Sequence, residues 1–181
     1  MTSFAKRGER EIYKGHVISL ASGTFVGPDG EEFERDIVHH PGAVSIVPAH
    51  EDGTVTLVRQ YRAPLDAELL EVPAGKRDVA GEDVAITAAR ELAEEVGLVA
   101  GRLELLVEFY NSPGFSDEHS FVFLARDLTA CAMERDGVEE MAMQIERVAL
   151  ADAPSLIAAG EIKDAKTIIG LLLARERLGM S

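Results

Sequence analysis

The most constraining feature of this sequence is the segment of residues 75–98, in which a glycine loop leads into an acidic helix. Glu91, Glu94 and Glu95 stand at positions i, i+3 and i+4, which are neighbours on one side of an α-helix. Like charges at this spacing repel each other by roughly a few tenths of a kcal/mol per pair. A hard divalent cation, which prefers oxygen ligands, would turn this repulsion into attraction. The pattern therefore indicates a metal site, although an acidic cluster can also be a solvated helix surface.

The helical wheel distinguishes these two interpretations. At about 100° per residue, one apolar stripe is formed by Ala85, Ala88, Ala89, Leu92 and Val96. Glu91 and Glu95 lie beside this stripe, so we expect them in a cleft, and the wheel places Thr87, Arg90 and Glu94 farther round. Glu82 and Asp83 put negative charge at the helix start, where the helix dipole favours it, and Gly97 suits the left-handed position that ends a helix.

At this level of detail the segment resembles the Nudix box. That pattern is Gly, five residues, Glu, seven residues, then Arg-Glu-apolar-x-Glu-Glu-x-Gly-apolar. Every named position is filled here, by Gly75, Glu82, Arg90, Glu91, Leu92, Glu94, Glu95, Gly97 and Leu98. One departure is that six residues, not five, separate the first glycine from the first glutamate. The extra residue falls in a loop, where insertions cost little, but it affects how Glu82 is aimed.

The resemblance implies a hydrolase that cleaves a phosphoanhydride with Mg²⁺ or Mn²⁺. Divalent cations neutralise phosphoryl oxygens and make a bound water nucleophilic. The implied ligands are Glu91 and Glu95 first, with Glu94 and Glu82 assisting, and the backbone carbonyl of Ala74.

The resemblance also implies the other catalytic groups. Arg90 is expected to pair with a box glutamate and orient it, and Glu94 is counted with the catalytic residues as well as with the ligands. The general base is expected in the acidic segment of residues 136–140. Glu140 is favoured slightly over Glu139, and either could instead be simply solvated.

Features outside the box resemble the ADP-ribose pyrophosphatase branch of the family. They are Pro113 after the box, the run VRQYR with its arginines Arg59 and Arg62, and LLEVPAG, which contains Glu71. By this resemblance Arg62 and Arg59 are substrate-binding candidates, Arg62 for the pyrophosphate or ribose, and Glu71 lies in the substrate cleft. Arg35 matches a position that reaches the adenosine half, either of its own site or of the partner's site in a dimer. Arginine suits such work because its planar fork binds oxygens in pairs, but each of these residues could instead form a surface ion pair.

The function that the resemblance implies is hydrolysis of ADP-ribose to AMP and ribose 5-phosphate. The residues of the box bind only metal and pyrophosphate and do not distinguish the rest of the substrate. Other nucleoside diphosphate sugars and dinucleotides, such as GDP-mannose, ADP-glucose and NADH, therefore remain alternatives. A non-catalytic ADP-ribose sensor is a third hypothesis. The presence of every box glutamate argues against the sensor.

Composition limits the partners. A net charge of −14, from 32 acidic and 18 basic side chains, disfavours a protein that grips long nucleic acid. The first ten residues have no apolar stretch, and the longest apolar run, residues 168–174, is too short to span a bilayer. The single cysteine, Cys131, is expected as a small core residue and fits a reducing compartment. We therefore expect a cytoplasmic protein with no membrane partner.

Alternating apolar residues and turn signals predict the remaining elements. Strands are expected within residues 11–40, around the turn Gly27–Gly30, and at 43–48, 54–61, about 103–110, 119–125 and near 141–149. Residues 134–140 are expected to be an acidic loop. Helices are expected at about 152–159 and 164–178, the second with a core face of Ile168, Ile169, Leu172, Leu173 and Leu178.

This order of elements predicts an α/β (α+β) protein. The resemblance implies a Nudix-type α/β/α sandwich with a mixed sheet, covering residues 41–181. Residues 1–40 are expected to form a small antiparallel sheet with too little apolar material to stand alone. In this branch that sheet serves dimerisation and substrate contact, so we expect a homodimer.

Overall fold

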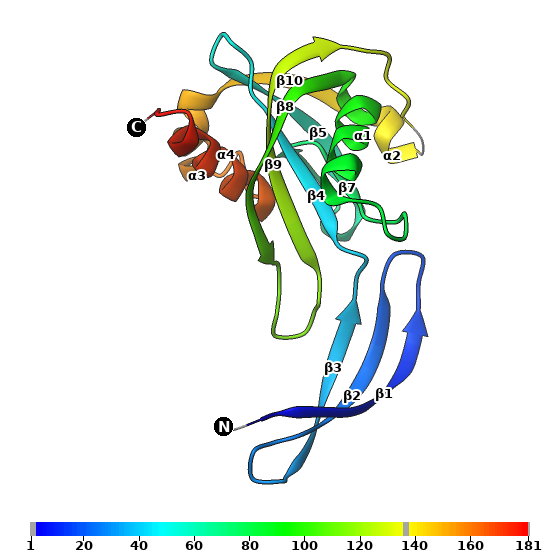
Figure 1. Ribbon diagram of the computed structural model, residues 1–181. Helices are drawn as coiled ribbons and strands as arrows, with labels where there is room; N and C mark the ends of the chain where they lie inside the picture. The colour runs from blue at the N-terminus through cyan, green and yellow to red at the C-terminus, as the bar shows by residue number, and fades with distance from the viewer. Residues whose placement is uncertain (1–2, 136–137, 181) are drawn as a thin grey trace. The chain divides into compact units, whose positions relative to one another are not determined.

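The computed structural model describes residues 3–135 and 138–180 and contains two compact units (Figure 1). The smaller unit comprises residues 1–42 together with 109–119, and the larger comprises 43–108 and 120–181. Within the described residues, no helix is long and apolar enough to cross a membrane.

The smaller unit is an antiparallel sheet of three strands in the order β1-β2-β3. The strands are β1 (Ala5–Lys14), β2 (Ser19–Val26) and β3 (Glu32–His39). The turn after β2 has Gly30 at φ 86°, a conformation that favours glycine. All ten residues of β1 are exposed, so this sheet has little buried surface of its own.

The segment of residues 109–119 belongs to this smaller unit. The N–H of Val38 donates to the carbonyl of Phe115 at 2.7 Å, and the N–H of Asp117 donates to the carbonyl of Val38 at 3.1 Å. His39 lies between two carboxylates, with Nδ1 2.5 Å from Asp117 Oδ2 and Nε2 3.0 Å from Glu9 Oε1. Backbone and side-chain contacts therefore both hold this segment against β3.

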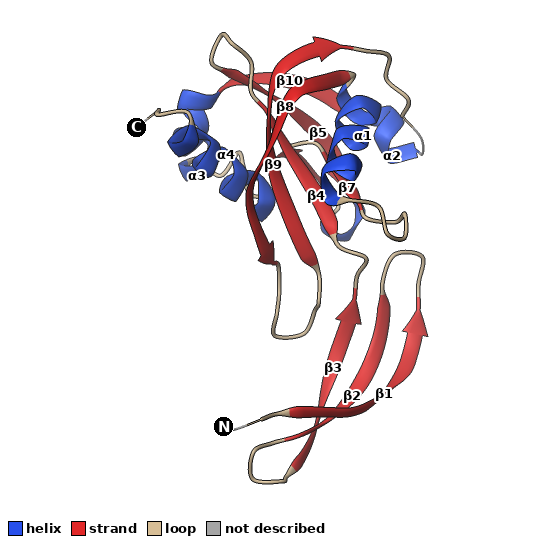
Figure 2. Ribbon diagram, in the orientation of Figure 1, coloured by secondary structure: helices blue, strands red, loops and turns tan. Residues whose placement is uncertain are grey.

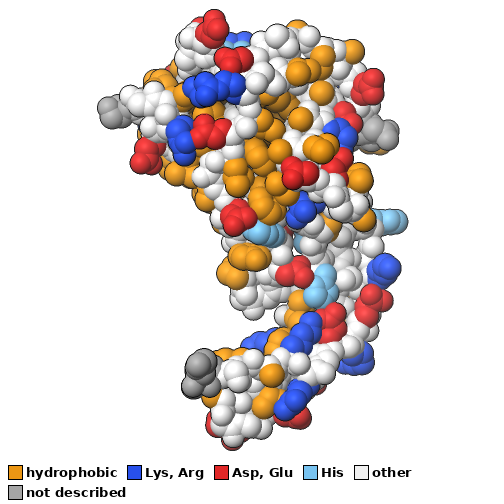
Figure 3. Space-filling view, in the orientation of Figure 1, with side chains coloured by type: hydrophobic (Ala, Val, Ile, Leu, Met, Phe, Trp, Pro, Cys, Tyr) orange, Lys and Arg blue, Asp and Glu red, His pale blue; other side chains and the backbone are white. Residues whose placement is uncertain are grey.

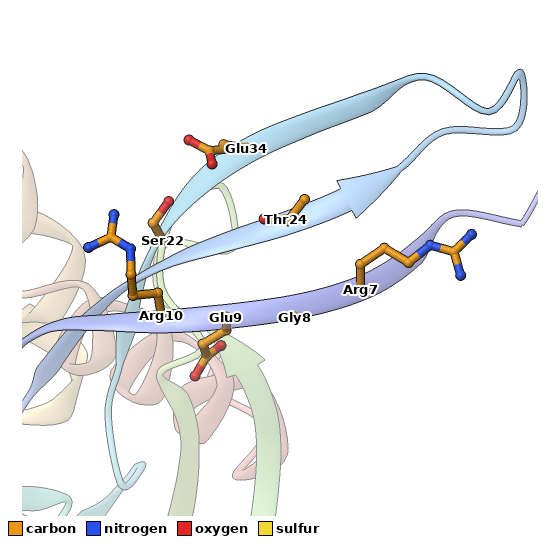
Figure 4. Close-up of a pocket in the computed structure, with 7 residues that line it drawn as sticks. All are labelled: Arg7, Gly8, Glu9, Arg10, Ser22, Thr24 and Glu34. Atoms are coloured by element: carbon orange, nitrogen blue, oxygen red, sulfur yellow. The ribbon is translucent and has the colours of Figure 1, made fainter.

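A shallow hollow of about 350 Å³ lies on this sheet (Figure 4). It is lined by Arg7, Gly8, Glu9, Arg10, Ser22, Thr24 and Glu34. Two arginines are balanced by two glutamates, so the lining lacks the excess of one charge that would attract an ion.

The larger unit is built on two sheets. The four-stranded sheet has the order β7-β4-β9-β8, with β4 parallel to β9 and antiparallel to β7, so it is mixed. Its strands are β4 (Ala43–Pro48), β7 (Ala74–Lys76), β8 (Leu98–Tyr110) and β9 (His119–Ala130). The antiparallel sheet β10-β5-β6 consists of β5 (Thr54–Arg62), β6 (Ala67–Glu71) and β10 (Gln144–Ala149).

Helices cover both faces of the mixed sheet, with α1 (Val84–Val96) on one side and α3 (Ala153–Ala158) and α4 (Ala165–Arg177) on the other (Figure 2). Strand alternation explains this, because successive side chains point to opposite faces. Val44 and Ile46 belong to the buried cluster that includes Leu92 of α1. Val47 faces Gly170 of α4 instead. The expected α/β/α sandwich with a mixed sheet is confirmed.

Helix α1 has the expected ends. The Asp83 side chain accepts the N–H of Ala85 at 2.8 Å, and Gly97 closes the helix at φ 64°. Ala88, Leu92 and Val96 are buried as expected. The wheel is wrong at two positions, because Ala89 is exposed and Thr87 is buried. The Thr87 hydroxyl donates to Glu82 at 2.7 Å, which satisfies a polar group that the wheel assigned to the surface.

The expected core face of α4 is also wrong. The buried residues are Thr167, Gly170, Leu171 and Ala174, while Leu172 is 44% exposed. A Cβ at Gly170 would lie 3.0 Å from methyl groups of both Val47 and Val122. The helix therefore approaches the sheet closely at Gly170, and the buried face is the one that Gly170 shares with Thr167, Leu171 and Ala174.

Two further expectations need correction. The segment expected to be an acidic loop contains a short helix, α2 (Val138–Ala142), formed by Glu, Met and Ala residues of high helix propensity. Cys131 is exposed, not in the core, because its backbone follows β9 and its N–H donates to the carbonyl of Gly97 at 2.8 Å.

On the face of the larger unit in Figure 3, charged side chains of both signs are scattered among exposed hydrophobic atoms.

Candidate active site

The site is centred on Glu95, which is buried at the C-terminal end of α1. Its Oε2 accepts the N–H of Ala74 at 2.9 Å. The pKa of Glu95 is raised to about 8, chiefly by burial and also by the charges of Glu91 and Glu140, against the lowering effect of the Ala74 N–H and Arg62. The negative charge of this buried carboxylate is only partly neutralised by its neighbours, which suits it to binding a cation.

Glu91 lies one turn earlier and presses against the glycine that opens the box. A Cβ added to Gly75 would lie 1.9 Å from Glu91 Cδ and 2.2 and 2.3 Å from its two oxygens. Only glycine leaves room for the carboxylate here. Burial raises the pKa of Glu91, and the adjacent Arg90 charge opposes that rise.

Arg90 forms ion pairs with several carboxylates of the box. Its Nη1 lies 2.9 Å from Glu91 Oε1 and 2.9 Å from Glu94 Oε2, and its Nη2 lies 3.5 Å from Glu82 Oε2. The extra residue before Glu82 thus leaves that side chain within reach of the helix. Arg90 therefore pairs with three of the box glutamates.

The arginines of the VRQYR run point to different faces of β5. Arg62 Nε and Nη2 bond Glu71 Oε1 and Oε2 at 2.7 and 2.6 Å, while 37% of the Arg62 side chain stays exposed. Arg59 instead bonds Glu146 of β10, with Nε 2.5 Å from Oε1. The structure therefore separates Arg59 from Arg62, as the alternation of a strand requires.

The resemblance implied that Glu71 lies in the substrate cleft. In the structure its side chain is fully buried, so it does not face an open cleft. Besides Arg62, its Oε2 contacts Lys166 Nζ, and Gln60 Nε2 at 3.5 Å. Two cations thus surround one buried carboxylate.

The remaining candidates lie on other elements. Glu139 and Glu140 are both on α2, and the charge of Glu140 acts on Glu95. Asp136 and Gly137, from the same expected segment, lie outside the described residues. Arg35 belongs to the smaller unit, where its guanidinium lies 4.7 Å from the centroid of the Phe33 ring.

The donor atoms fit a hard divalent cation. Among the described residues, no three acidic, histidine or cysteine side chains already converge as a ligand cluster. The reason is visible in the contacts: Arg90 neutralises Glu91 and Glu94, and Ala74 supports Glu95. The buried Glu95 and the mostly covered Glu91 nonetheless offer carboxylate oxygens of raised pKa beside residues 74–75, which is the oxygen-rich environment that Mg²⁺ and Mn²⁺ prefer.

Sequence reasoning missed several residues near this site. Lys166, Asp164 and Thr167 form the start of α4 and reach the Glu71 region, and Arg135 Nε donates to the carbonyl of Glu95 at 2.8 Å. One signal was present, because a lysine in the first turn of a helix opposes the helix dipole. Such a position suggests a specific anionic partner for Lys166.

Comparisons with known proteins agree with this geometry. Residues 39–168 match the family described as the NUDIX domain. The chain is 40% identical over 159 residues to an ADP-ribose pyrophosphatase of Bacillus subtilis (strain 168), covering 88% of this chain and 85% of that protein. It is 38% identical over 161 residues to an ADP-ribose pyrophosphatase of Mycobacterium tuberculosis (strain ATCC 25618 / H37Rv), covering 89% and 78%. A crystal structure of an ADP compounds hydrolase superimposes with a TM-score of 0.84 and 25% identity, covering 97% of this chain and 94% of that one.

Proposed function

Because this chain belongs to the Nudix family, we propose that it hydrolyses ADP-ribose to AMP and ribose 5-phosphate with Mg²⁺ or Mn²⁺. The observation that carries the proposal is the pair Glu91 and Glu95, one helical turn apart: Glu95 is buried and bonded to the Ala74 N–H, and Glu91 is only 12% exposed. The printed names of the two relatives support ADP-ribose as the substrate.

The proposed ligands are Glu91, Glu95 and the Ala74 carbonyl, with Glu94 and Glu82 assisting. A bound divalent cation would neutralise charge on the diphosphate oxygens and activate water. Arg90 keeps Glu91 and Glu94 in place through its two 2.9 Å contacts. Removal of metal by EDTA should abolish activity, and added Mg²⁺ should restore it. Full activity in EDTA would exclude the metal site.

Arg62 is the proposed diphosphate-binding residue. Glu71 holds its Nε and Nη2, so Nη1 is the part of the fork that this bond does not occupy. Arg62 is also close enough to Glu95 to lower the pKa of that carboxyl. A diphosphate that bound to a divalent cation held by Glu91 and Glu95 would therefore be within the influence of Arg62. Arg59, bonded to Glu146, is the weaker candidate for substrate contact.

The general base is proposed to be Glu140, with Glu139 as the alternative, because the Glu140 charge already acts on Glu95. Loss of a general base typically lowers the rate by roughly 10²–10⁴-fold. The variants Glu139→Gln and Glu140→Gln should be compared separately at saturating Mg²⁺. Near-wild-type kcat for both would assign the base to another residue.

The experiment that tests the substrate is one panel with Mg²⁺ and with Mn²⁺. It contains ADP-ribose, ADP-glucose, GDP-mannose, NADH and nucleoside triphosphates, with kcat/KM measured for each. We expect the highest value for ADP-ribose. A higher value for another nucleoside diphosphate sugar or for NADH would change the substrate but keep the reaction, whereas a preference for a triphosphate would contradict the proposed branch.

A homodimer in the cytoplasm is proposed for the intact protein. A three-stranded sheet needs a covered hydrophobic face to be stable, yet β1 exposes Ile12 and Tyr13. Cys131 as the only cysteine suits a reducing compartment. Light scattering on the full-length chain should give twice the mass of one chain, and a monomer at micromolar concentration would contradict the dimer.

A further inference from the structure

The first turn of α4 contacts the same buried carboxylate that holds Arg62. Lys166 Nζ contacts Glu71 Oε2 and lies 2.9 Å from Asp164 Oδ1. The side chains of Lys166 and Asp164 are 15% and 17% exposed, and that of Glu71 is fully buried. Burying a lysine costs free energy unless it is paired. The position of Lys166 therefore indicates that its contact with Glu71 serves a function.

The contacts show what Lys166 changes. Lys166 Nζ contacts Glu71 Oε2, the same oxygen that Arg62 Nη2 bonds, and Asp164 Oδ1 in turn pairs with Lys166. Two cations and two carboxylates therefore balance, so Lys166 acts by holding the position of Glu71 and not by adding net charge. Arg62 is the most exposed side chain of this group.

The same helical turn also fixes the backbone that leads to the box. Asp164 Oδ2 accepts the N–H and the hydroxyl of Thr167 at 2.9 and 2.6 Å. The Thr167 hydroxyl oxygen accepts the N–H of Val72 at 2.9 Å. Two residues farther along, the Ala74 N–H donates to Glu95. The start of α4 therefore holds both the side chain that anchors Arg62 and the backbone just before β7, the strand whose Ala74 N–H bonds Glu95.

We infer that Lys166 is a positioning residue for diphosphate binding, which acts on the substrate only through Glu71 and Arg62. This inference rests on the proposed function, because it requires that Arg62 bind the diphosphate. Lys166 itself would not touch substrate. Its contribution is to hold Glu71 in the orientation that aims the Arg62 guanidinium.

The test compares Lys166→Met with Lys163→Met, a matched control in which an exposed lysine of the same segment is changed. With ADP-ribose at saturating Mg²⁺, Lys166→Met should raise KM roughly tenfold or more, the scale found for groups that orient a binding side chain, and lower kcat less. Lys166→Arg should recover part of the loss, because it retains the charge. Lys163→Met should match the wild type. Equal KM values for Lys166→Met and Lys163→Met would overturn the inference.

A double-mutant cycle separates a positioning role from an independent one. If Lys166 acts through Arg62, Lys166→Met should add no further increase of KM in an Arg62→Met background. Additive effects would overturn the inference. Thermal unfolding of each variant shows whether any loss reflects stability, and the Lys166→Arg variant keeps the test valid if Lys166→Met folds poorly.

A spectroscopic measurement distinguishes failure of this inference from failure of the proposed function. The NMR resonance of Arg62 Nε–H should shift in Lys166→Met and stay unchanged in Lys163→Met. A wild type inactive on ADP-ribose and every other nucleoside diphosphate sugar would contradict the proposed function, while this shift would still report the link from Lys166 to Arg62. An unchanged Arg62 resonance would overturn the link itself.

Discussion

The close approach of Gly75 and Glu91 shows why the box begins with glycine. The carboxylate of Glu91 occupies the space that any side chain at position 75 would need. The requirement is therefore steric and not conformational, because the constraint is a contact and no left-handed backbone angle occurs at this position. It links a residue of β7 directly to a proposed metal ligand on α1.

We predict that Gly75→Ala lowers kcat/KM by roughly 10²-fold, because the added Cβ displaces the Glu91 carboxylate and a misplacement of about 1 Å costs that much in a positioned site. Binding of Mn²⁺, measured by calorimetry, should weaken in parallel. Gly8→Ala is the control, since no atom lies within 4 Å of a Cβ at that position. Wild-type kcat/KM for Gly75→Ala would mean that Glu91 is not a ligand.

The raised pKa of Glu95 makes a second prediction at the residue scale. Its pKa of about 8 in the folded protein lies above the ordinary glutamate value of 4.5, so the folded state binds an extra proton between these values. The free energy of unfolding of the metal-free protein should therefore fall as pH rises from 4.5 towards 8. Saturating Mg²⁺ should remove that fall, because the cation replaces the proton.

Urea unfolding in EDTA between pH 5 and pH 8, with and without Mg²⁺, measures this effect. Glu95→Gln is the control, because the amide has no proton to lose and its stability should be flatter over the same range. A metal-free wild type whose stability does not decrease towards pH 8 would indicate a solvated Glu95.

At the scale of elements, α1 was predictable and α4 was only partly so. The ends of α1 follow from Asp83 and Gly97, whose preferences are local. The face of α4 depends on how closely Gly170 approaches Val47 and Val122, which are distant in sequence. Lys166 escaped notice for the same reason, because its partner Glu71 is on another element. Periodicity finds helices but cannot find what a helix packs against.

A prediction at the scale of elements concerns His39, which contacts residues of β1 and of the segment of residues 109–119 from its position in β3. Hydrogen bonding to Asp117 raises the pKa of His39, and Glu9 raises it further. Because the folded pKa lies above the ordinary histidine value of 6.5, the contribution of His39 to stability is fully present below pH 6.5. It is lost as pH rises through the folded pKa.

An NMR titration of the imidazole should show this raised pKa, and Asp117→Asn should lower it towards 6.5 because the amide removes the negative charge. Amide hydrogen exchange of Val38 and Asp117, whose backbones are bonded, should speed up above the folded pKa. His39→Gln should show the faster exchange at every pH. An unshifted His39 pKa in the wild type would contradict the contact.

At the scale of the whole molecule, the α/β class followed from the order of elements, and the sandwich followed from the resemblance in the box. The membership of residues 109–119 in the smaller unit did not follow. That grouping depends on bonds such as Val38 to Phe115, which join segments with no common sequence pattern. Non-local pairing of this kind sets the unit boundaries, and it places Pro113 and its neighbours with the N-terminal strands.

The proposed dimer gives the last prediction, because Arg35 is expected to complete the partner's site. We predict that Arg35→Ala and Glu95→Gln are each poorly active as homodimers but recover activity when co-expressed with two different tags. In the mixed dimer one site has intact Glu95 on its own chain and intact Arg35 from the other. Tandem purification isolates this mixed dimer for measurement of kcat/KM.

Co-expression of Glu95→Gln with Glu91→Gln is the matched control, since both changes fall in the box and no mixed site then has two intact carboxylates on one chain. That pair should stay inactive. Recovery with Arg35→Ala but not with Glu91→Gln would require sites built from two chains. An inactive mixed dimer of Arg35→Ala and Glu95→Gln, correctly assembled by light scattering, would confine Arg35 to its own chain or remove it from the substrate site.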